Sequence, residues 1–166
     1  IAACAPAGTT VVSFQNGVEN VARIQSAAPQ VQAIAGMVPY NVMLKSRSHS
    51  HRATDGTLFI EDSDHSRVLK SIFIKAGLPI ELRSDMRAVQ WGKLLLNLNN
   101  PINALSNLPL KTQLEDAHYR QALAGLQNEA LAVLKKAGLR PAKVGKVAPQ
   151  VLPKLLQLPN WAFKRI

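Results

Sequence analysis

The sequence predicts an α/β portion followed by an all-helical portion. A β-branched run at 9–14, a helical segment at 18–27 and an apolar run at 31–42 form the strand–helix–strand pattern of a βαβ unit. In the second portion, helical periodicity continues almost without interruption. We therefore expect two domains, at 1–84 and 85–166.

The elements of the first portion each have a local signal. Gln15-Asn16-Gly17 has turn chemistry and ends the first strand, and Pro29 stops the helix that follows. Asp55-Gly56 between two extended runs predicts a β-hairpin. The apolar periodicity of 64–76 predicts a helix, and 79–83 is typical of an edge strand.

The second portion opens with a helix over 85–105. Pro101 is expected to kink it, because proline has no N–H to donate and its ring pushes against the preceding turn. A long helix is expected over 112–137, with Thr112 and Glu115 as a capping box. Later prolines divide the rest of the chain into shorter segments.

A polar stripe runs along the kinked helix. At about 100° per residue, Asn97 and Asn100 fall within about 40° of Lys93, whereas apolar residues fill a broad arc opposite. Pro101 cannot donate to the carbonyl of Asn97, which leaves an acceptor beside the stripe. A cation, two amides and this carbonyl could hold a small ligand with a carbonyl and a carboxylate. The alternative is a solvated helix face, and spacing alone leaves both open.

The net charge of +10, from 20 Lys and Arg against 10 Asp and Glu, favours an anionic partner. The basic clusters at 45–52 and 135–146 contain no aromatic residue, so base stacking on an aromatic platform is not expected. A small anionic molecule explains the charge equally well. We expect a small-molecule substrate rather than nucleic acid.

Cysteine and histidine content limits the chemistry. The single cysteine, Cys4, excludes an internal disulfide and a multi-cysteine metal site, and it suits a cytoplasmic protein. His49 and His51 could form a metal pair on an extended run, but a solvated hairpin is the simpler interpretation, and we predict no metal site. No apolar run approaches the ~18 residues of a membrane helix. The chain opens on Ile1 without the start of a signal peptide, and we expect a piece of a longer protein.

Common catalytic motifs are missing. The chain contains no Gly-x-Gly-x-x-Gly loop, no Walker loop and no nucleophilic serine elbow. What remains is the polar stripe and Asn16, which follows a predicted strand. Ligands of open α/β sheets bind at the carboxyl ends of strands, so Asn16 is a candidate site residue. It could equally be a left-handed turn residue.

Two motifs together resemble a known family. Ser13-Phe-Gln-Asn-Gly-Val18 after a β-branched strand, followed by Trp91-x-Lys93-x-x-x-Asn97-x-x-Asn100-Pro101, is similar to ketopantoate reductase (2-dehydropantoate 2-reductase). The resemblance extends to the end of the long helix. It implies that 1–84 is the rear part of a Rossmann-like NAD(P)-binding domain and that 85–166 begins a helical domain of the 6-phosphogluconate dehydrogenase type.

The resemblance also implies roles for individual residues. Lys93 corresponds to the catalytic lysine, which holds and protonates the keto oxygen of the substrate. Asn97 and Asn100 correspond to substrate-binding asparagines. Asn16 corresponds to an asparagine near both nicotinamide and substrate, and Val42, expected on the second strand, to a position whose backbone meets the cofactor. A supporting glutamate of the family's next long helix corresponds to Glu129.

The family reaction is the reduction of 2-dehydropantoate to pantoate by NADPH, a step of pantothenate and coenzyme A biosynthesis. Some departures are visible: the family's glycine-rich loop is missing, its late serine and glutamate should lie beyond Ile166, and Leu110 stands where some members have asparagine. The alternatives are a related NAD(P)-dependent reductase of another 2-keto acid, a basic nucleic-acid-binding module, and a structural dimerisation domain. The last is compatible with the first, because such reductases pair through the helical domain.

Overall fold

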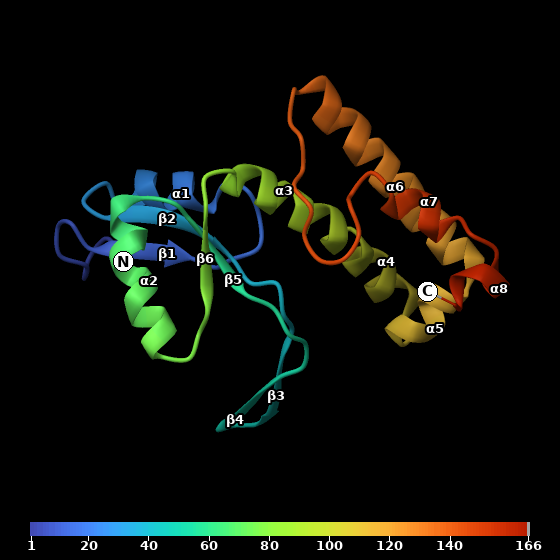
Figure 1. Cartoon of the computed structure of the whole chain (residues 1–166), viewed down its shortest axis with the longest axis horizontal. Coiled ribbons are helices and arrows are strands. Elements are labelled where there is room, and N and C mark those ends of the chain that lie inside the picture. The colour runs from blue at the N-terminus through green and yellow to red at the C-terminus, as the bar shows by residue number, and fades with distance from the viewer. Residues whose placement is uncertain (166) are drawn as a thin grey trace. The chain divides into compact units, whose positions relative to one another are not determined.

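The computed structural model describes residues 1–165, and the chain folds as two compact units, Ile1–Gln90 and Trp91–Ile166. The first unit contains a four-stranded sheet in the order β1-β2-β5-β6 (Figure 1). Its strands are β1 (Thr10–Ser13), β2 (Gln32–Met37), β5 (Leu58–Glu61) and β6 (Ile80–Arg83). The pairs β1–β2 and β5–β6 are parallel, whereas β2 and β5 are antiparallel. The sheet is therefore mixed, which confirms the α/β prediction.

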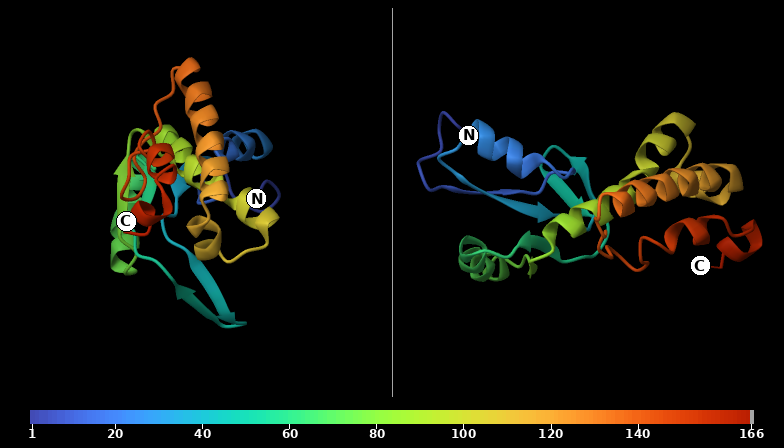
Figure 2. Two further views of the ribbon diagram at one scale, coloured as in Figure 1. Left: turned by 90° about the vertical axis from the view of Figure 1, so that its right-hand side faces the viewer. Right: turned by 90° about the horizontal axis from the view of Figure 1, so that it is seen from above.

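Each parallel pair is joined by one helix. Helix α1 (Asn20–Ala27) connects β1 to β2, and α2 (Asp64–Lys75) connects β5 to β6. In both pairs the second strand lies on the same side of the first, but the strands of one pair are antiparallel to those of the other. Right-handed crossover connections therefore place α1 and α2 on opposite faces of the sheet. Figure 2 shows this arrangement, with the sheet between α1 and α2. The predicted βαβ unit and the edge position of β6 are both confirmed.

One face of this sheet carries an apolar core. Ile34, Leu58, Ile60 and Ile80 are buried there, and Phe73 of α2 packs against them. Helix α2 begins with a reciprocal capping box, in which the Ser63 hydroxyl accepts from the Ser66 N–H and the Ser66 hydroxyl accepts from the Ser63 N–H.

The hairpin lies elsewhere than predicted. Strands β3 (Val42–Ser46) and β4 (His49–Arg52) form an antiparallel pair with every residue exposed, and Figure 1 shows it projecting from the first unit. Asp55-Gly56 instead lies in the connection between β4 and β5. The second strand ends at Met37, so Val42 is not on it but opens the hairpin. Pro39 ends the ladder there, because it has no N–H to donate.

Helices make up the second unit. Helix α3 (Met86–Asn97) crosses the boundary at residue 90, and α4 (Asn99–Ser106), α5 (Leu110–Glu115), α6 (Ala117–Lys136), α7 (Leu152–Leu156) and α8 (Asn160–Phe163) follow. The predicted kinked helix is thus two helices, which separate at Leu98.

The predicted long helix is also divided. Helices α5 and α6 separate at Asp116, whose backbone is extended and whose carboxylate accepts a hydrogen bond from the His118 N–H at 2.8 Å. The capping box predicted from Thr112 and Glu115 is therefore wrong, because both residues lie inside α5 and the true N-cap of α6 is Asp116. Gly138, at φ +69°, follows the C-terminal end of α6.

A buried arginine organises the end of the second unit. Arg120 is fully buried on α6, and its guanidinium donates to the carbonyl oxygens of Leu114, Leu156 and Leu158. It also donates to Asn160 Oδ1 at 2.6 Å and lies 4.4 Å from the centre of the Phe163 ring. One side chain therefore links α5, α7 and α8 to α6.

Within the described residues, no helix has the length and apolar character needed to cross a bilayer. In the same part of the chain, no three His, Cys, Asp or Glu side chains gather as a metal site would require. His49 and His51 lie on the exposed strand β4.

Candidate functional site

Two of the predicted substrate contacts share one helical face. Lys93 and Asn97 lie one turn apart on α3, so their side chains project from the same side of the helix. Both are half-buried, whereas Asn100, beyond the break on α4, is exposed. Lys93 and Asn97 therefore precede the break between α3 and α4, and Asn100 follows it.

Lys93 has an environment that suits a proton donor. Within the described part of the chain, no carboxylate forms an ion pair with it, and burial lowers the pKa of its ammonium below the ordinary value of 10.5. Desolvation disfavours the charged form, so the proton is released more readily than from a lysine in water. A lysine of this kind is a better general acid near neutral pH than an exposed one.

The break between α3 and α4 is held by amide side chains. Gln127 on α6 donates from Nε2 to the Leu95 carbonyl oxygen at 3.3 Å, and Gln113 on α5 donates from Nε2 to Asn99 Oδ1 at 2.8 Å. Gln113 is fully buried and Gln127 is 3% exposed. The break is therefore tied to two different helices of the same unit.

Backbone packing supports α3 at a neighbouring position. Gly92 is buried, and a Cβ on it would clash with the carbonyl oxygen of Ala142 and press against Val144. Only glycine allows the segment after α6 to approach α3 this closely. The residue next to Lys93 is thus fixed by tertiary packing.

Asn16 and Val42 belong to the first unit. Asn16 is exposed and follows the carboxyl end of β1, where its carbonyl accepts a hydrogen bond from the Asn20 side chain at 2.8 Å. Its φ is negative, and the positive φ of this turn belongs to Gly17 at +114°, so the left-handed alternative for Asn16 is wrong. Val42 is 57% exposed at the start of the hairpin.

Glu129 is exposed on α6, away from the buried face that carries Gln127. Among the described residues, no hydrogen bond or ion pair joins it to Lys93 or to the asparagines. The structure therefore does not bring Glu129 into direct contact with the polar stripe.

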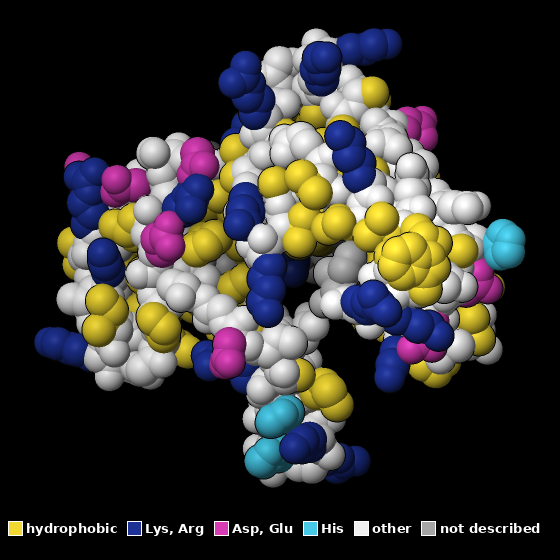
Figure 3. Space-filling view, turned by 45° about the vertical axis from the view of Figure 1, so that its right-hand side comes forward, with side chains coloured by type: hydrophobic (Ala, Val, Ile, Leu, Met, Phe, Trp, Pro, Cys, Tyr) yellow, Lys and Arg dark blue, Asp and Glu magenta, His cyan; other side chains and the backbone are white. Residues whose placement is uncertain are grey.

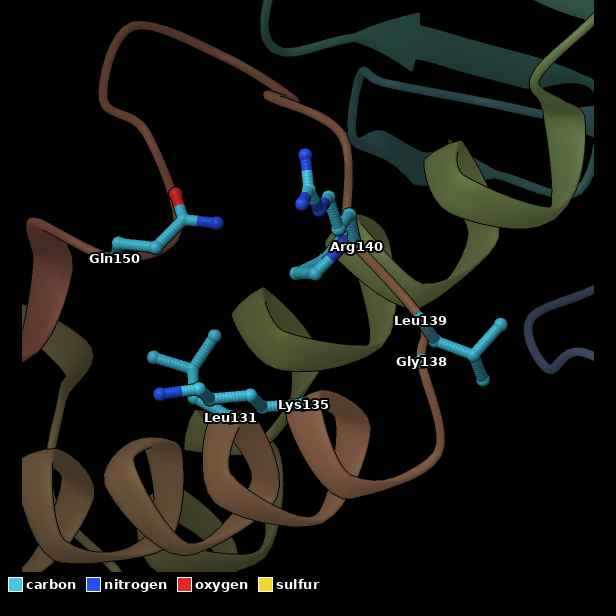
Figure 4. A pocket seen from close by; sticks show the side chains of 7 residues that line it. Leu131, Lys135, Gly138, Leu139, Arg140 and Gln150 are labelled. Carbon is cyan, nitrogen blue, oxygen red and sulfur yellow. The ribbon is translucent and has the colours of Figure 1, made fainter.

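A separate pocket of about 490 Å³ opens beside the C-terminal end of α6 (Figure 4). Lys135, Arg140 and Gln150 supply its polar groups, and the side chains of Arg140 and Gln150 extend toward one another. No Asp or Glu follows Glu129 in the sequence, and no ion pair of Lys135 or Arg140 is found among the described residues. None of the predicted site residues lines this pocket. Elsewhere, on the face in Figure 3, Lys and Arg are spread over the surface rather than gathered into one patch.

The sequence interpretation missed Gln113, Gln127 and Arg120. A signal for two of them existed: Arg120, Leu123, Ala124, Gln127 and Leu134 recur at the spacing of one helical face, and all five are buried. A polar residue at the phase of a core position indicates a buried, hydrogen-bonded role. No equivalent signal marked Gln113, which lies on the short helix α5.

Comparisons with known proteins agree with the fold. The profile of the ketopantoate reductase PanE/ApbA family matches residues 1–65, and the profile of the C-terminal part of the same family matches 85–159. A search of curated proteins found no match to the chain.

Solved structures give the same result. A PanE/ApbA family ketopantoate reductase from Ralstonia eutropha JMP134 has a TM-score of 0.74 and 26% identity, and the match covers 89% of this chain and 47% of that one. A dimeric ketopantoate reductase from Staphylococcus aureus has a TM-score of 0.70 and 20% identity, with 91% and 50% covered. D-mandelate dehydrogenase in complex with NADH has a TM-score of 0.72 and 12% identity, with 90% and 50% covered.

The chain spans about half the length of these relatives. The match to D-mandelate dehydrogenase supports the fold alone, whereas the two family profiles cover both the sheet-containing and the helical parts of the chain. On this evidence the chain belongs to the ketopantoate reductase PanE/ApbA family of oxidoreductases.

Proposed function

We propose that this protein reduces 2-dehydropantoate to pantoate with NADPH, in the cytoplasm, as a step of pantothenate and coenzyme A biosynthesis. The observation that carries the proposal is the half-buried ammonium of Lys93, which has no counter-ion among the described residues and lies one helical turn from Asn97. Membership of the ketopantoate reductase family supports the reaction class.

In this proposal, Lys93 is the catalytic residue. A keto carbon that accepts a hydride leaves growing negative charge on its oxygen. An ammonium group that binds this oxygen stabilises the transition state more than the ground state. Because burial lowers the pKa of Lys93, the same group can then donate its proton to the oxygen.

The asparagines orient the substrate. Amide groups bind carbonyl and carboxylate oxygens without adding charge, so the ammonium of Lys93 stays the dominant local cation. We assign this role to Asn97 and Asn100, and a supporting role to Glu129. The profile of the C-terminal part of the family matches 85–159, which contains all three residues, and this supports the assignment.

The nicotinamide dinucleotide supplies the hydride. Asn16, which is exposed at the carboxyl end of β1, fits the place where open α/β sheets bind ligands. We propose that Asn16 and the backbone of Val42 hold the nicotinamide end. Residues 1–84 would then act as part of the dinucleotide-binding domain, and 85–166 as part of the substrate and dimerisation domain.

A second candidate is a reductase of another 2-keto acid. The likeness to D-mandelate dehydrogenase favours testing an aromatic keto acid, because that structure shares the fold. Oxidation of NADPH and of NADH, measured with 2-dehydropantoate and with benzoylformate, separates the two substrates and the two cofactors. A homodimer is also proposed, by analogy with the dimeric S. aureus enzyme, and sedimentation measures it.

The decisive experiment replaces Lys93. In the full-length enzyme, Lys93→Ala should lower kcat about 100- to 1,000-fold, as the loss of an oxyanion donor does, while the fold is retained. Asn97→Ala should raise KM for the keto acid. Lys136→Ala, an exposed lysine at the end of α6, is the matched control and should leave kcat unchanged. An unaltered kcat in Lys93→Ala would exclude the proposed role.

A further inference from the structure

The break between α3 and α4 lies between residues to which we assign substrate contacts. Asn97 is the last residue of α3 and Asn100 is in the first turn of α4. The direction in which the chain leaves α3 therefore sets where Asn100 lies relative to Lys93 and Asn97. If Asn97 and Asn100 bind one substrate, the backbone at the break between α3 and α4 must hold a single conformation.

Gln127 holds the last turn of α3. In a continuous helix the Leu95 carbonyl would accept from the N–H of residue 99, four positions later. At the break, the Nε2 of Gln127 donates to this carbonyl instead, across 32 positions in the sequence. Leu95 lies midway between Lys93 and Asn97, so this bond anchors the turn that carries both.

Gln113 holds the first turn of α4. Its Nε2 donates to Asn99 Oδ1 at 2.8 Å, next to Asn100 in the sequence. On the α3 side, Gly92 admits the Ala142 backbone next to Lys93. The segment is thus fixed on both sides of the break and by different elements.

The energetics of these amides argue against a purely structural role. Within the described residues, the Oε1 atoms of Gln113 and Gln127 are buried without a hydrogen-bond partner. An unpaired buried acceptor costs free energy, and a methionine of similar volume would remove that cost but would also take the donor away from the Leu95 carbonyl oxygen or from Asn99 Oδ1. The net contribution of each glutamine to stability is therefore small, and the property that only the amide supplies is one directed donor.

We propose that Gln127 and Gln113 are positioning residues, which fix the break between α3 and α4 so that Lys93, Asn97 and Asn100 face one substrate. The inference rests on the proposed function only for the identity of the reaction. The placement of Lys93 by Gln127 can be measured without any catalytic activity.

The experiment compares Gln127→Met with Gln121→Met, the same substitution at an exposed position on the same helix. NMR of the lysine side chains follows the titration of Lys93, assigned from the signal lost in Lys93→Arg. We expect the pKa of Lys93 to move toward its ordinary value in Gln127→Met, because the released turn admits water, and to stay unchanged in Gln121→Met. Equal titration in both variants would overturn the inference.

Kinetics give the second readout. We expect Gln127→Met to lower kcat about 10- to 100-fold and to displace the pH profile of kcat, since small misplacements of reacting groups are costly. The midpoint of urea unfolding should change little, because Gln127→Met removes an unpaired acceptor and also removes the donor of the Leu95 carbonyl oxygen. A lower midpoint with unchanged kcat would indicate a structural residue and refute the inference. Gln113→Met, which leaves the half-buried Asn99 within reach of water, keeps the test valid if Gln127→Met fails to fold.

The two proposals fail differently. If the unsubstituted full-length enzyme reduces no 2-keto acid, the proposed function is wrong, and the Lys93 titration still decides the role of Gln127. If the protein is active but Gln127→Met and Gln113→Met match the Gln121→Met control in titration and kinetics, the positioning role is wrong and the reaction stands.

Discussion

Replacing Arg120 should unfold the end of the second unit. Its guanidinium donates to the carbonyl oxygens of Leu114, Leu156 and Leu158 at 2.8–3.0 Å and to Asn160 Oδ1 at 2.6 Å. Arg120→Met fills much of the same volume but removes every donor. The acceptors then remain with no donor among the described side chains, each at a cost of about 1–3 kcal/mol where water cannot reach it.

The magnitude can be bounded from the structure. A hydrogen bond to a charged group typically contributes about 1.5–3 kcal/mol, and Arg120→Met removes several of them at once while leaving only neutral acceptors. A domain of this size is stable by only about 5–15 kcal/mol, so Arg120→Met should lose a large share of the free energy of unfolding. The free energy of unfolding of Arg120→Lys should lie between those of the unsubstituted protein and Arg120→Met. An ammonium has three donors but cannot reproduce the planar arrangement of donors in a guanidinium.

Urea unfolding measures this effect directly. Both tryptophans, Trp91 and Trp161, belong to the second unit, so their fluorescence reports on the unfolding of that unit. Arg140→Met is the matched control, since Arg140 is exposed and no ion pair involving it is found among the described residues. A loss below about 1 kcal/mol in Arg120→Met would refute the reasoning, because surface substitutions alone produce changes of about 0.5 kcal/mol.

Two further predictions concern α3. Gly92→Ala should destabilise the second unit by about 1–3 kcal/mol in urea unfolding, because its Cβ clashes with the Ala142 carbonyl oxygen, whereas Gly125→Ala on α6 meets open space and should be neutral or stabilising. Lys93→Met should raise the free energy of unfolding at neutral pH, where the unsubstituted protein keeps a charged lysine half-buried. Because the unfolded state binds more protons between the lowered pKa of Lys93 and 10.5, the stability of the unsubstituted protein rises with pH in that window. The advantage of Lys93→Met should therefore shrink as pH approaches 10.5, and an advantage that is constant with pH would contradict the assigned cause.

Residue patterns within short segments predicted the strands and helices of the first unit correctly where the packing of the unit favours the same secondary structure. The β-branched run at 10–13 forms β1, and the amphipathic segment at 64–75 forms α2. The hairpin was misplaced because Asp55-Gly56 is a strong turn signal, whereas the strands that pair are β3 and β4, which enclose Arg47 and Ser48. Strand pairing is decided by partners far away in sequence, which a turn motif does not report.

Helix boundaries in the second unit show the same limit. Apolar periodicity continues across Asp116, so the sequence predicts one helix, but the carboxylate of Asp116 caps α6 and ends α5. The break at Leu98 was expected near Pro101 and lies three residues before it. A proline removes its own N–H and crowds the preceding turn, so the disturbance appears on its N-terminal side.

The four asparagines at 97, 99, 100 and 103 now divide into two groups. Asn99 accepts from Gln113, and Asn103 donates to the Leu108 carbonyl oxygen at 3.0 Å. These two residues therefore have structural roles: Asn99 stabilises the break, and Asn103 stabilises the turn after α4. Helix propensity disfavours asparagine at all four positions. Asn97 and Asn100 are the two on the same helical stripe as Lys93, and in the proposed function they bind the substrate that this lysine holds.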